Sequence, residues 1–398
     1  MSQIRIAILD TGSIERPLGG QSTYLRGVIP HLAGDVTFWG QEAEHAICLE
    51  CSSSHGTVEK LVRCKTVVPV SRPGFRPRVP QRLSALVRVW LARSEIVAQS
   101  DVAYVNSPEM AFPLVCSRRH IPVVLHLHGA SHPLSSSRYA VGRIASVRAI
   151  YSLIFRLAVR RSDVVLSVDE SGVDLARTIR LNRTDDRVYL IPSCYDWATF
   201  RHTEQVPNLK PAFESGKLRI LFVGRLESGK GLRELLSALQ RWPDDLPEVT
   251  LTIVGEGSAR DTLEDLAHRL PVRASVEFAG WQQPAAVAEL MIRSDAVVLP
   301  SMQEGLPVVV LESLACGTPV LACEAGDVSR VVMDGVTGIV LSNNRPETLL
   351  EGLVELCSRK FSTKACTESV AAHSCAAVGT RVSDILHAVA AEHSRVTM

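Results

Sequence analysis

The segment from Leu299 to Ala322, LPSMQEGLPVVVLESLACGTPVLA, constrains the fold more than any other part of the sequence. An apolar run ends at Pro300 and a polar turn follows it. Pro307 then suits the first turn of a helix, because its missing N–H would have no partner there anyway. Gly317-Thr318-Pro319 returns the chain to a second apolar run. This order predicts a strand–helix–strand unit in a parallel sheet.

The turn before this helix predicts a site for an anion that also carries hydroxyl groups. Gly305 lets the backbone approach a ligand closely, and the helix start at Leu306 and Pro307 offers free N–H groups to an anion. Glu304 and Glu312 bracket the turn, and carboxylates accept hydrogen bonds from hydroxyl groups. A nucleotide sugar combines phosphate with hydroxyl groups, so we expect a nucleotide-sugar site.

The block EGLPVVVLE followed by ACGTPV resembles the signature of the family-four retaining glycosyltransferases, with seven residues between Glu304 and Glu312. The resemblance implies the GT-B fold, an α/β architecture of two Rossmann-like parallel-sheet domains that face each other across a cleft. It also implies that Glu304 holds hydroxyl groups of the donor sugar and that Glu312 holds the ribose. The alternative is a strand–helix–strand unit with two incidental glutamates.

A second glycine-rich turn, Gly224 to Gly231, follows the predicted strand Leu218 to Val223. Arg225 can bind a diphosphate through its planar fork, and Lys230 can bind it as a point charge. The turn is not a P-loop, because Gly231 follows the lysine, but it resembles the GRL…KG segment of the same family. Farther along, Gly280 follows another strand and is expected to place backbone beside a nucleobase.

The N-terminal half offers a glycine pair and a histidine pair. Gly19 and Gly20 stand between a buried strand and a helix, where backbone amides can contact a phosphate or a hydroxyl group. His126 and His128 lie near the end of the predicted strand Val123 to Leu127 and point to one face, at the edge where α/β sheets bind ligands. The resemblance implies that His128 orients the donor sugar. His126 is the second candidate, and a structural role is the alternative for both.

Length and composition predict a soluble two-domain protein. The chain has 398 residues, 46% hydrophobic and 21% charged, which is too long for one typical core. We expect an acceptor-binding domain at 1–200, a linker at 201–216, a nucleotide-sugar domain at 217–370 and a helical segment at 371–398 that crosses back to the first domain. No apolar run reaches the roughly 18 residues of a membrane span, and no signal peptide precedes the first strand.

The cysteines and acidic residues predict neither a metal nor a cofactor. Ten cysteines without a disulfide framework indicate a reducing cytoplasm. Cys48 and Cys51 have metal-ligand spacing, but no second pair accompanies them, so we expect free thiols. No metal motif lies at the nucleotide site, and the resemblance likewise implies metal independence. A UDP-sugar is favoured as donor only because uridine is common in such enzymes.

The charge distribution leaves two interpretations open. Residues 1–200 contain 24 Lys and Arg against 17 Asp and Glu, whereas residues 201–398 contain 19 against 25. From Met110 to Ser162 there are eight arginines and no acidic residue. These side chains form either solvated helix faces or a surface for an anionic acceptor or an acidic membrane. The helix predicted from Val79 adds an apolar stripe that either packs on the sheet or inserts into lipid: Leu83, Leu86, Val87, Trp90 and Leu91.

Together these features predict a retaining, metal-independent hexosyltransferase that moves a sugar from a nucleoside-diphosphate sugar to an acceptor hydroxyl. Glu304, His128, Arg225 and Lys230 are the predicted catalytic residues. The expected acceptor is a glycan or a lipid-linked molecule in surface polysaccharide or glycolipid assembly, in the cytoplasm or at the inner face of the membrane, and no nucleic acid is expected as partner. The alternatives are a nucleotide-sugar epimerase or hydrolase and a catalytically silent partner of another transferase.

Overall fold

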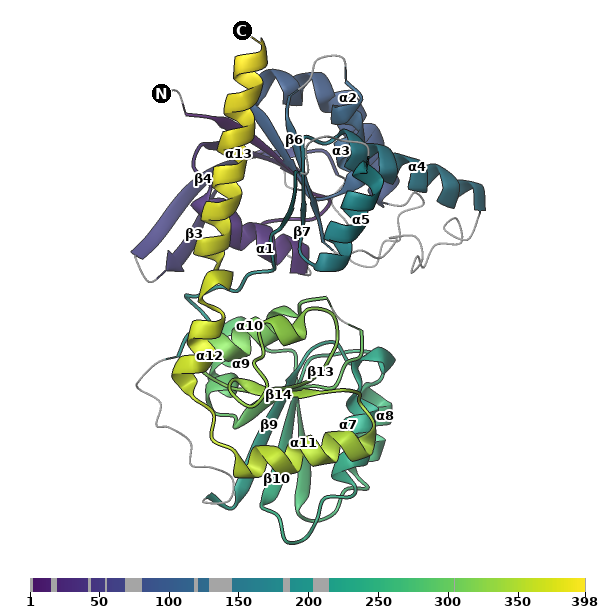
Figure 1. Ribbon diagram of the computed structural model, residues 1–398, viewed down its shortest axis with the longest axis vertical. Coiled ribbons are helices and arrows are strands. Elements are labelled where there is room, and N and C mark those ends of the chain that lie inside the picture. Colours follow the sequence, from purple (N-terminus) through teal and green to yellow (C-terminus); the bar gives the residue numbers. More distant parts are fainter. Residues whose placement is uncertain are drawn as a thin grey trace. The chain divides into compact units, whose positions relative to one another are not determined.

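The computed structural model (Figure 1) describes residues 3–15, 20–41, 44–53, 56–68, 81–117, 121–128, 145–181, 187–202, 215–303 and 305–397. The chain forms two compact units, Met1–Ser193 with Cys375–Met398, and Cys194–Ser374. The N-terminal stretch of unit 1 therefore ends at Ser193, whereas the first domain was expected to end at residue 200. The C-terminal segment that belongs to unit 1 starts at Cys375, not at residue 371. Most of the expected linker, residues 203–214, lies outside the described part of the chain.

Unit 1 is built on an eight-stranded sheet with the order β3-β4-β2-β1-β5-β6-β7-β8. Neighbouring strands are parallel except β3 and β4, which are antiparallel. The sheet of this unit is thus parallel apart from one antiparallel pair at its edge, where the short connection between β3 and β4 allows only a hairpin. The strands are β1 (Arg5–Leu9), β2 (Asp35–Gly40), β3 (Ala46–Ser53), β4 (Gly56–Thr66), β5 (Val102–Val105), β6 (Val123–Leu127), β7 (Val164–Ser167) and β8 (Val188–Leu190).

Helices cover both faces of this sheet. On one face α2 (Gln81–Gln99), α3 (Pro108–Val115), α4 (Ala145–Arg161) and α5 (Glu170–Arg180) share a buried apolar cluster with β1, β5 and β6. On the other, α13 (Cys375–Thr397) contacts α1 (Gly20–Val28) and the 3₁₀ turn η1 (Ile29–His31), and Figure 1 shows it lying along the unit. The hydroxyl of Ser383 accepts a hydrogen bond from the Ala33 N–H at 2.9 Å, which ties α13 to the chain after η1.

Unit 2 is built on a six-stranded sheet with the order β11-β10-β9-β12-β13-β14, and every pair in it is parallel. Its strands include fully buried apolar runs, as expected for a parallel sheet covered on both faces, and also runs that alternate with polar residues. They are β9 (Lys217–Val223), β10 (Glu248–Val254), β11 (Ala274–Gly280), β12 (Ala296–Leu299), β13 (Val320–Cys323) and β14 (Gly338–Leu341).

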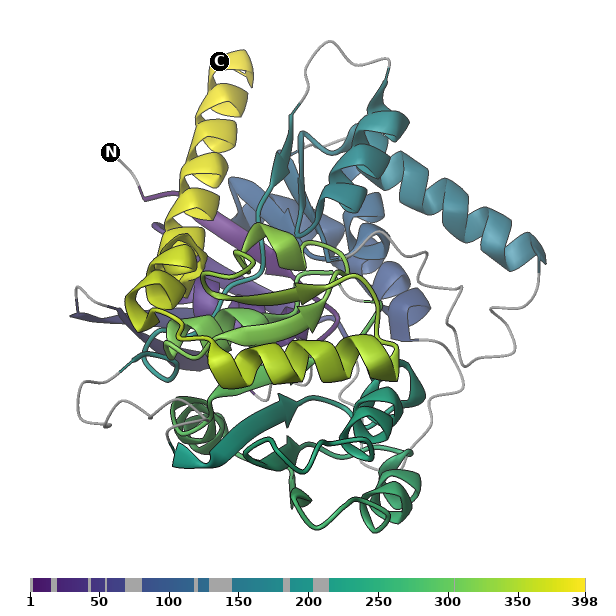
Figure 2. The same cartoon turned by 60° about the horizontal axis from the view of Figure 1, so that its bottom comes forward.

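Two apolar clusters attach helices to the faces of the second sheet. One cluster joins the sheet to α7 (Leu232–Leu239), α8 (Arg260–Ala267) and α11 (Pro346–Ser358). The other joins it to α9 (Pro284–Ile292), α10 (Val308–Ala315) and α12 (Thr363–Ser369). Figures 1 and 2 show α11 as a long helix across one face. The short turns η3 (Ser228–Lys230), η4 (Val328–Arg330) and η5 (Ala371–His373) complete the described elements.

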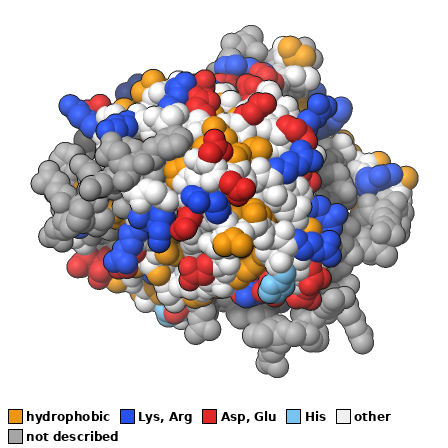
Figure 3. All heavy atoms as spheres, turned by 90° about the horizontal axis from the view of Figure 1, so that it is seen from below, with side chains coloured by type: hydrophobic (Ala, Val, Ile, Leu, Met, Phe, Trp, Pro, Cys, Tyr) orange, Lys and Arg blue, Asp and Glu red, His pale blue; other side chains and the backbone are white. Residues whose placement is uncertain are grey.

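Two surface properties bear on the interpretation of the sequence. The face in Figure 3 carries Lys and Arg side chains intermixed with Asp and Glu, and apolar side chains lie among them. Such mixing is usual for a solvated surface. None of the described helices combines the length and the apolar character that crossing a membrane requires.

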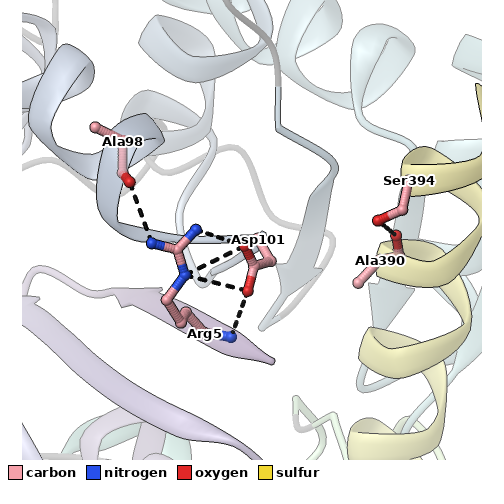
Figure 4. A network of polar contacts seen from close by, with 5 residues as sticks. All are labelled: Arg5, Ala98, Asp101, Ala390 and Ser394. Atoms are coloured by element: carbon pink, nitrogen blue, oxygen red, sulfur yellow. Dashed lines mark hydrogen bonds and ion pairs between the residues drawn. The ribbon is translucent and has the colours of Figure 1, made fainter. Parts of the chain in front are cut away.

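An ion pair joins the start of β1 to the turn before β5 (Figure 4). The Arg5 backbone N–H donates to the Asp101 carboxylate at 2.8 Å and the guanidinium donates to it at 2.6 Å. Arg5 also donates to the Ala98 carbonyl at 3.3 Å. Burial raises the pKa of Asp101, but the hydrogen bonds from Arg5 outweigh it, so this pKa is lowered overall. The carboxylate is therefore ionised and bonded at neutral pH.

We predict that Asp101→Ala weakens the pairing of β1 with β5. The substitution leaves the Arg5 N–H without its protein acceptor, which costs about 1 kcal/mol. Hydrogen exchange of the β1 and β5 amides should become faster, since it reports local opening. Glu347→Ala, which removes an exposed carboxylate paired with Arg241, is the control and should leave this exchange unchanged. Unaltered exchange in the Asp101 variant would contradict the prediction.

Candidate functional site

The glycine-rich turn after β9 is held by backbone contacts with the neighbouring strand exits. Gly224 N–H donates to the Val254 carbonyl and Leu226 N–H to the Glu256 carbonyl, both at 3.0 Å. At the end of the turn Gly231 has φ +73°, and a Cβ there would lie 2.0 Å from the Pro300 carbonyl oxygen. Only glycine combines this conformation with so close an approach. The turn is thus fixed against the loop that follows β12.

The loop after β12 brings the predicted anion-binding residues to the same place. Ser301 is buried, and its hydroxyl donates to the Gly229 carbonyl at 3.4 Å. Gly305 is exposed, whereas Leu306 is buried beneath it. Pro307 is the N-cap of α10, so the helix begins at Val308, one residue later than the sequence suggested. Glu304 lies outside the described residues, and its predicted role stays a prediction.

Sheet topology explains why these two loops meet. From β9 the chain continues through β10 to β11 on one side, whereas β12, β13 and β14 extend on the other. The neighbours β9 and β12 therefore form the point where the strand order reverses. In open α/β sheets ligands bind outside the carboxyl ends of the strands at this point. The structure thus joins the turn that carries Gly224, Arg225 and Lys230 to the loop that leads to Gly305, Leu306 and Pro307, through the close approach of Gly231 to Pro300 and the hydrogen bond from Ser301 to Gly229.

Gly280 lies two strands away from this point, at the end of β11. Its carbonyl accepts a hydrogen bond from Gly255 N–H at 2.8 Å, and it has φ +67°. Because neighbouring strands are about 4.8 Å apart, the exits of β9 and β11 are roughly 10 Å apart, a suitable span for a nucleoside. The arrangement is compatible with a diphosphate at β9 and a base near β11.

Positive charge at this edge comes from the turn after β9. The Arg225 side chain is 70% exposed, and its Nη1 donates to Glu227 at 2.9 Å. Exposed pairs of this kind are weak, so a phosphate can replace the glutamate as partner of the guanidinium. Lys230 ends η3 in the same turn. Among the residues described, no three His, Cys, Asp or Glu side chains are grouped as metal ligands.

The surroundings of Glu312, on α10, favour the protonated form of its carboxyl group. Burial raises the pKa of this carboxyl to about 7, and the negative charge of Asp196 adds to the effect. Asp196 accepts hydrogen bonds from Ala198 N–H at 3.0 Å and from the Thr199 hydroxyl at 2.7 Å. Sequence reasoning missed this neighbour, because nothing in the spacing of residues 196 and 312 connects them.

In unit 1 the predicted residues lie at the exits of β1, β5 and β6. Gly20 begins α1, whereas Gly19 lies outside the described residues. His128 directly follows β6, and its Nε2 lies 2.9 Å from the Asn106 side-chain oxygen. His126 is completely buried, and its Nδ1 lies 2.6 Å from the Tyr104 hydroxyl. Of the two histidines, His128 is therefore the one at the sheet edge.

Three further polar residues, which sequence reasoning missed, complete this edge. Gln21 donates through Nε2 to the Asp10 carboxylate and to the Asn106 carbonyl, the latter at 2.9 Å. Asp10 directly follows β1, and Asn106 directly follows β5. These neighbours form the switch point of the first sheet. Asp10 and Asn106 could have been predicted from the sequence, because each is a polar residue immediately after a buried strand.

Comparison with known proteins agrees with the architecture of two α/β units described above. Residues 18–198 match the family model described as Glycosyltransferase Family 4, and residues 208–371 match the one described as Glycosyl transferases group 1. A lipopolysaccharide outer core galactosyltransferase is 14% identical with a TM-score of 0.67, covering 97% of this chain and 99% of that one. An Anabaena protein solved in complex with UDP is 17% identical with a TM-score of 0.67, covering 98% of this chain and 100% of that one.

Relatives among curated proteins are similar over shorter stretches. Glycogen synthase of Mycobacterium tuberculosis is 29% identical over 241 residues, which is 60% of this chain and 56% of that protein. A D-inositol 3-phosphate glycosyltransferase of Xylanimonas cellulosilytica is 34% identical over 197 residues, 46% of this chain and 45% of that protein. The chain thus spans about half the length of the curated relatives it matches.

The fold and the paired α/β units define a protein of the GT-B class. With both family models matched in succession, the chain belongs to the family-four glycosyltransferases.

We predict that Glu312 makes the stability of unit 2 depend on pH. Its pKa is about 7 in the fold against 4.5 ordinarily, so folding favours the protonated form. The stabilisation is complete below the ordinary pKa and is lost as the pH rises through about 7, a change on the order of 2–3 kcal/mol. Calorimetric melting should show this fall in the wild type and not in Glu312→Gln. Glu324→Gln, an exposed site, should behave as wild type. An equal fall in the Glu312 variant would contradict the assignment.

Proposed function

We propose that this protein transfers a sugar from a UDP-sugar to an acceptor hydroxyl with retention at the anomeric carbon. The observation that carries the proposal is the convergence of a cationic glycine turn and a helix start at the β9–β12 switch point. This convergence suits a diphosphate. The Anabaena protein was solved in complex with UDP and also in complex with UDP-glucose, which favours uridine in the donor.

The proposed step breaks the bond between the anomeric carbon and the donor phosphate oxygen and forms a bond from that carbon to the acceptor oxygen. The acceptor proton passes to the departing phosphate, which gains negative charge. Arg225, Lys230 and the start of α10 at Val308 are suited to stabilise this charge without a metal. Same-face attack is what membership of the family implies, whereas a double displacement would need a carboxylate nucleophile.

The remaining predicted residues receive roles that match their chemistry. Glu304 would accept hydrogen bonds from sugar hydroxyls, and Glu312 from the ribose. Burial lowers the pKa of His128 to about 4, so the ring is neutral at physiological pH and suits a neutral hydroxyl of the sugar.

An epimerase or hydrolase on the same scaffold would act on the donor alone, so product analysis without acceptor separates it from a transferase. A silent subunit would bind no donor.

Two variants separate donor binding from turnover. Arg225→Ala combined with Lys230→Ala should weaken UDP binding by at least about a hundredfold, since two charge-assisted contacts worth roughly 1.5–3 kcal/mol each are lost. Glu304→Ala should keep UDP affinity and lose turnover of the UDP-sugar, because the partners proposed for Glu304 are hydroxyl groups of the sugar. Titration calorimetry and UDP release measure the two effects.

The matched control for the double variant is Arg241→Ala with Arg269→Ala. Both residues are exposed and lie after the ends of α7 and α8, hence toward the opposite edge of the sheet. This control removes the same charge and should bind UDP normally. Unchanged UDP affinity in the Arg225 and Lys230 variant would refute the phosphate site. Absence of binding by the wild type to UDP and to the other nucleoside diphosphates would refute the donor class.

We further propose that unit 1 brings the enzyme to an anionic membrane surface, where a lipid-linked or polyanionic acceptor in surface polysaccharide or glycolipid assembly would be found. The support is the exposed face of α2, which carries Leu83, Val87 and Leu91 at 51%, 50% and 75% exposure. The stripe for which packing on the sheet and insertion into lipid were both open is thus largely outside the core. Ala85, Val89 and Ile96 are the buried positions of this helix instead.

A second helix adds to this surface. In α4 Ile150 and Leu153 are 60% and 58% exposed, and Figures 1 and 2 show the helix projecting from its unit. The arginines of α4 are exposed, and no acidic residue occurs in it. Trp90 of α2 stacks on Phe112 with ring centroids 6.4 Å apart, and Arg93 lies over its ring. Apolar side chains with arginines beside them match an anionic bilayer surface.

We expect the protein to sediment with vesicles of phosphatidylcholine and phosphatidylglycerol, and less so with phosphatidylcholine alone or in high salt. Val87→Glu with Leu91→Glu should abolish sedimentation, because it adds negative charge and removes apolar contact. Leu181→Glu with Val272→Glu changes equally exposed apolar residues elsewhere and should sediment as wild type. Sedimentation of the first variant at the wild-type level would exclude this surface.

A further inference from the structure

Asn106 stands out in unit 1 because it is buried, fixed by hydrogen bonds and still incompletely bonded. It is 4% exposed, yet its side-chain Nδ2 has no hydrogen-bond partner in the described structure. Its backbone carbonyl accepts a hydrogen bond from Gln21, and its Oδ1 lies 2.9 Å from His128 Nε2. A buried donor without a partner destabilises the fold, so a native protein that retains one usually has a use for it.

The contact with Asn106 determines which nitrogen of His128 carries the proton. An amide oxygen accepts and does not donate hydrogen bonds, so His128 Nε2 must carry the hydrogen in this contact. The ring is neutral, since burial lowers the pKa of His128 to about 4. A neutral imidazole protonated at Nε2 has a lone pair on Nδ1. Asn106 thereby leaves Nδ1 of His128 available as an acceptor.

The other groups around His128 do not change this assignment. Tyr24 of α1 meets the ring edge-on with centroids 5.2 Å apart, and His126 of β6 lies 4.4 Å away. Burial keeps the pKa of His126 well below its ordinary value, so its ring is also neutral. The carboxylate of Asp10 is bonded to Gln21 and to Gly12 N–H, the latter at 2.6 Å. No described group next to His128 therefore favours a second proton on it.

We propose that Asn106 is a positioning residue that holds His128 in its Nε2-protonated form, so that Nδ1 accepts a hydrogen bond from a hydroxyl of the donor sugar. A hydroxyl group has a proton to donate to the lone pair on Nδ1, whereas an anion has none. The identity of the hydroxyl group rests on the proposed sugar transfer, whereas the tautomer of His128 does not depend on it.

The tautomer is measured directly by nitrogen-15 NMR of the imidazole rings. The His128 signals are assigned by their loss in His128→Gln, because the chain has 12 histidines. We expect the pattern of a neutral ring protonated at Nε2 in the wild type, and a mixture of tautomers in Asn106→Ala. UDP-glucose, and not UDP, should shift the Nδ1 signal. A wild-type ring protonated at Nδ1 would overturn the proposal, whatever the enzyme transfers.

A pH profile tests the consequence for turnover. Asn106→Asp places a carboxylate against His128, which raises the pKa of the imidazole because an opposite charge favours its protonated form. Release of UDP from UDP-glucose should then fall about tenfold as the pH drops through the raised pKa, the loss expected for one hydrogen bond to the sugar. The wild type should show no such fall in this range.

The control is Asn343→Asp, the same chemical change at an exposed asparagine in unit 2; its profile should match the wild type. A profile of Asn106→Asp that matches the wild type while UDP still binds would overturn the positioning role alone. Failure of the wild type to bind UDP or UDP-glucose in calorimetry would instead overturn the proposed function. Melting temperatures of the variants show whether a loss of turnover reflects a loss of fold.

Discussion

The parallel pairing of β9 with β10 on one side and with β12 on the other is the constraint on which the nucleotide site depends. Ala296 and Val297 of β12 pair with Ile220 and Leu221 of β9, so the loops after both strands leave the sheet at one point. The missing Cβ of Gly231 allows these loops to touch through their backbones. Backbone pairing therefore brings the anion-binding groups together. The exposed side chain of Arg225 forms an ion pair with Glu227 in the same turn.

Unit 1 uses the same topology with different chemistry. Its switch point, between β1 and β5, carries Asp10 and Asn106, and His128 follows the next strand. Arg82 lies nearby, but its charge faces the buried Glu109, with 3.4 Å between Nε and Oε1. The edge of unit 1 thus offers neutral and acidic groups, whereas the edge of unit 2 offers cations. A phosphate suits the second edge, and hydroxyl groups suit the first.

Local patterns in the sequence were sufficient to predict the strands β9, β12 and β13 of unit 2 and the glycine turns after β9 and β12. Each depends on residues close together in the chain, such as the apolar run ending at Val223 and the glycine after it. The network of Asp10, Gln21 and Asn106 could not be predicted in this way, because Gln21 and Asn106 are 85 residues apart. In α2 the helical period was correct, but the sequence left open whether the apolar stripe packs on the sheet. Small and β-branched residues pack on the sheet, and the larger apolar side chains lie outside.

Burial moves Glu312 and His128, two of the ionisable groups that the family resemblance assigned to the donor, toward their neutral forms. The pKa of Glu312 rises to about 7 and that of His128 falls to about 4, so desolvation disfavours charge on both. Fixed positive charge is left to the exposed turn that carries Arg225 and Lys230. Neutral groups of this kind suit the hydroxyl groups of the proposed donor, and the cations suit its phosphates. This division places electrostatic stabilisation where negative charge develops during the proposed transfer, on the leaving diphosphate.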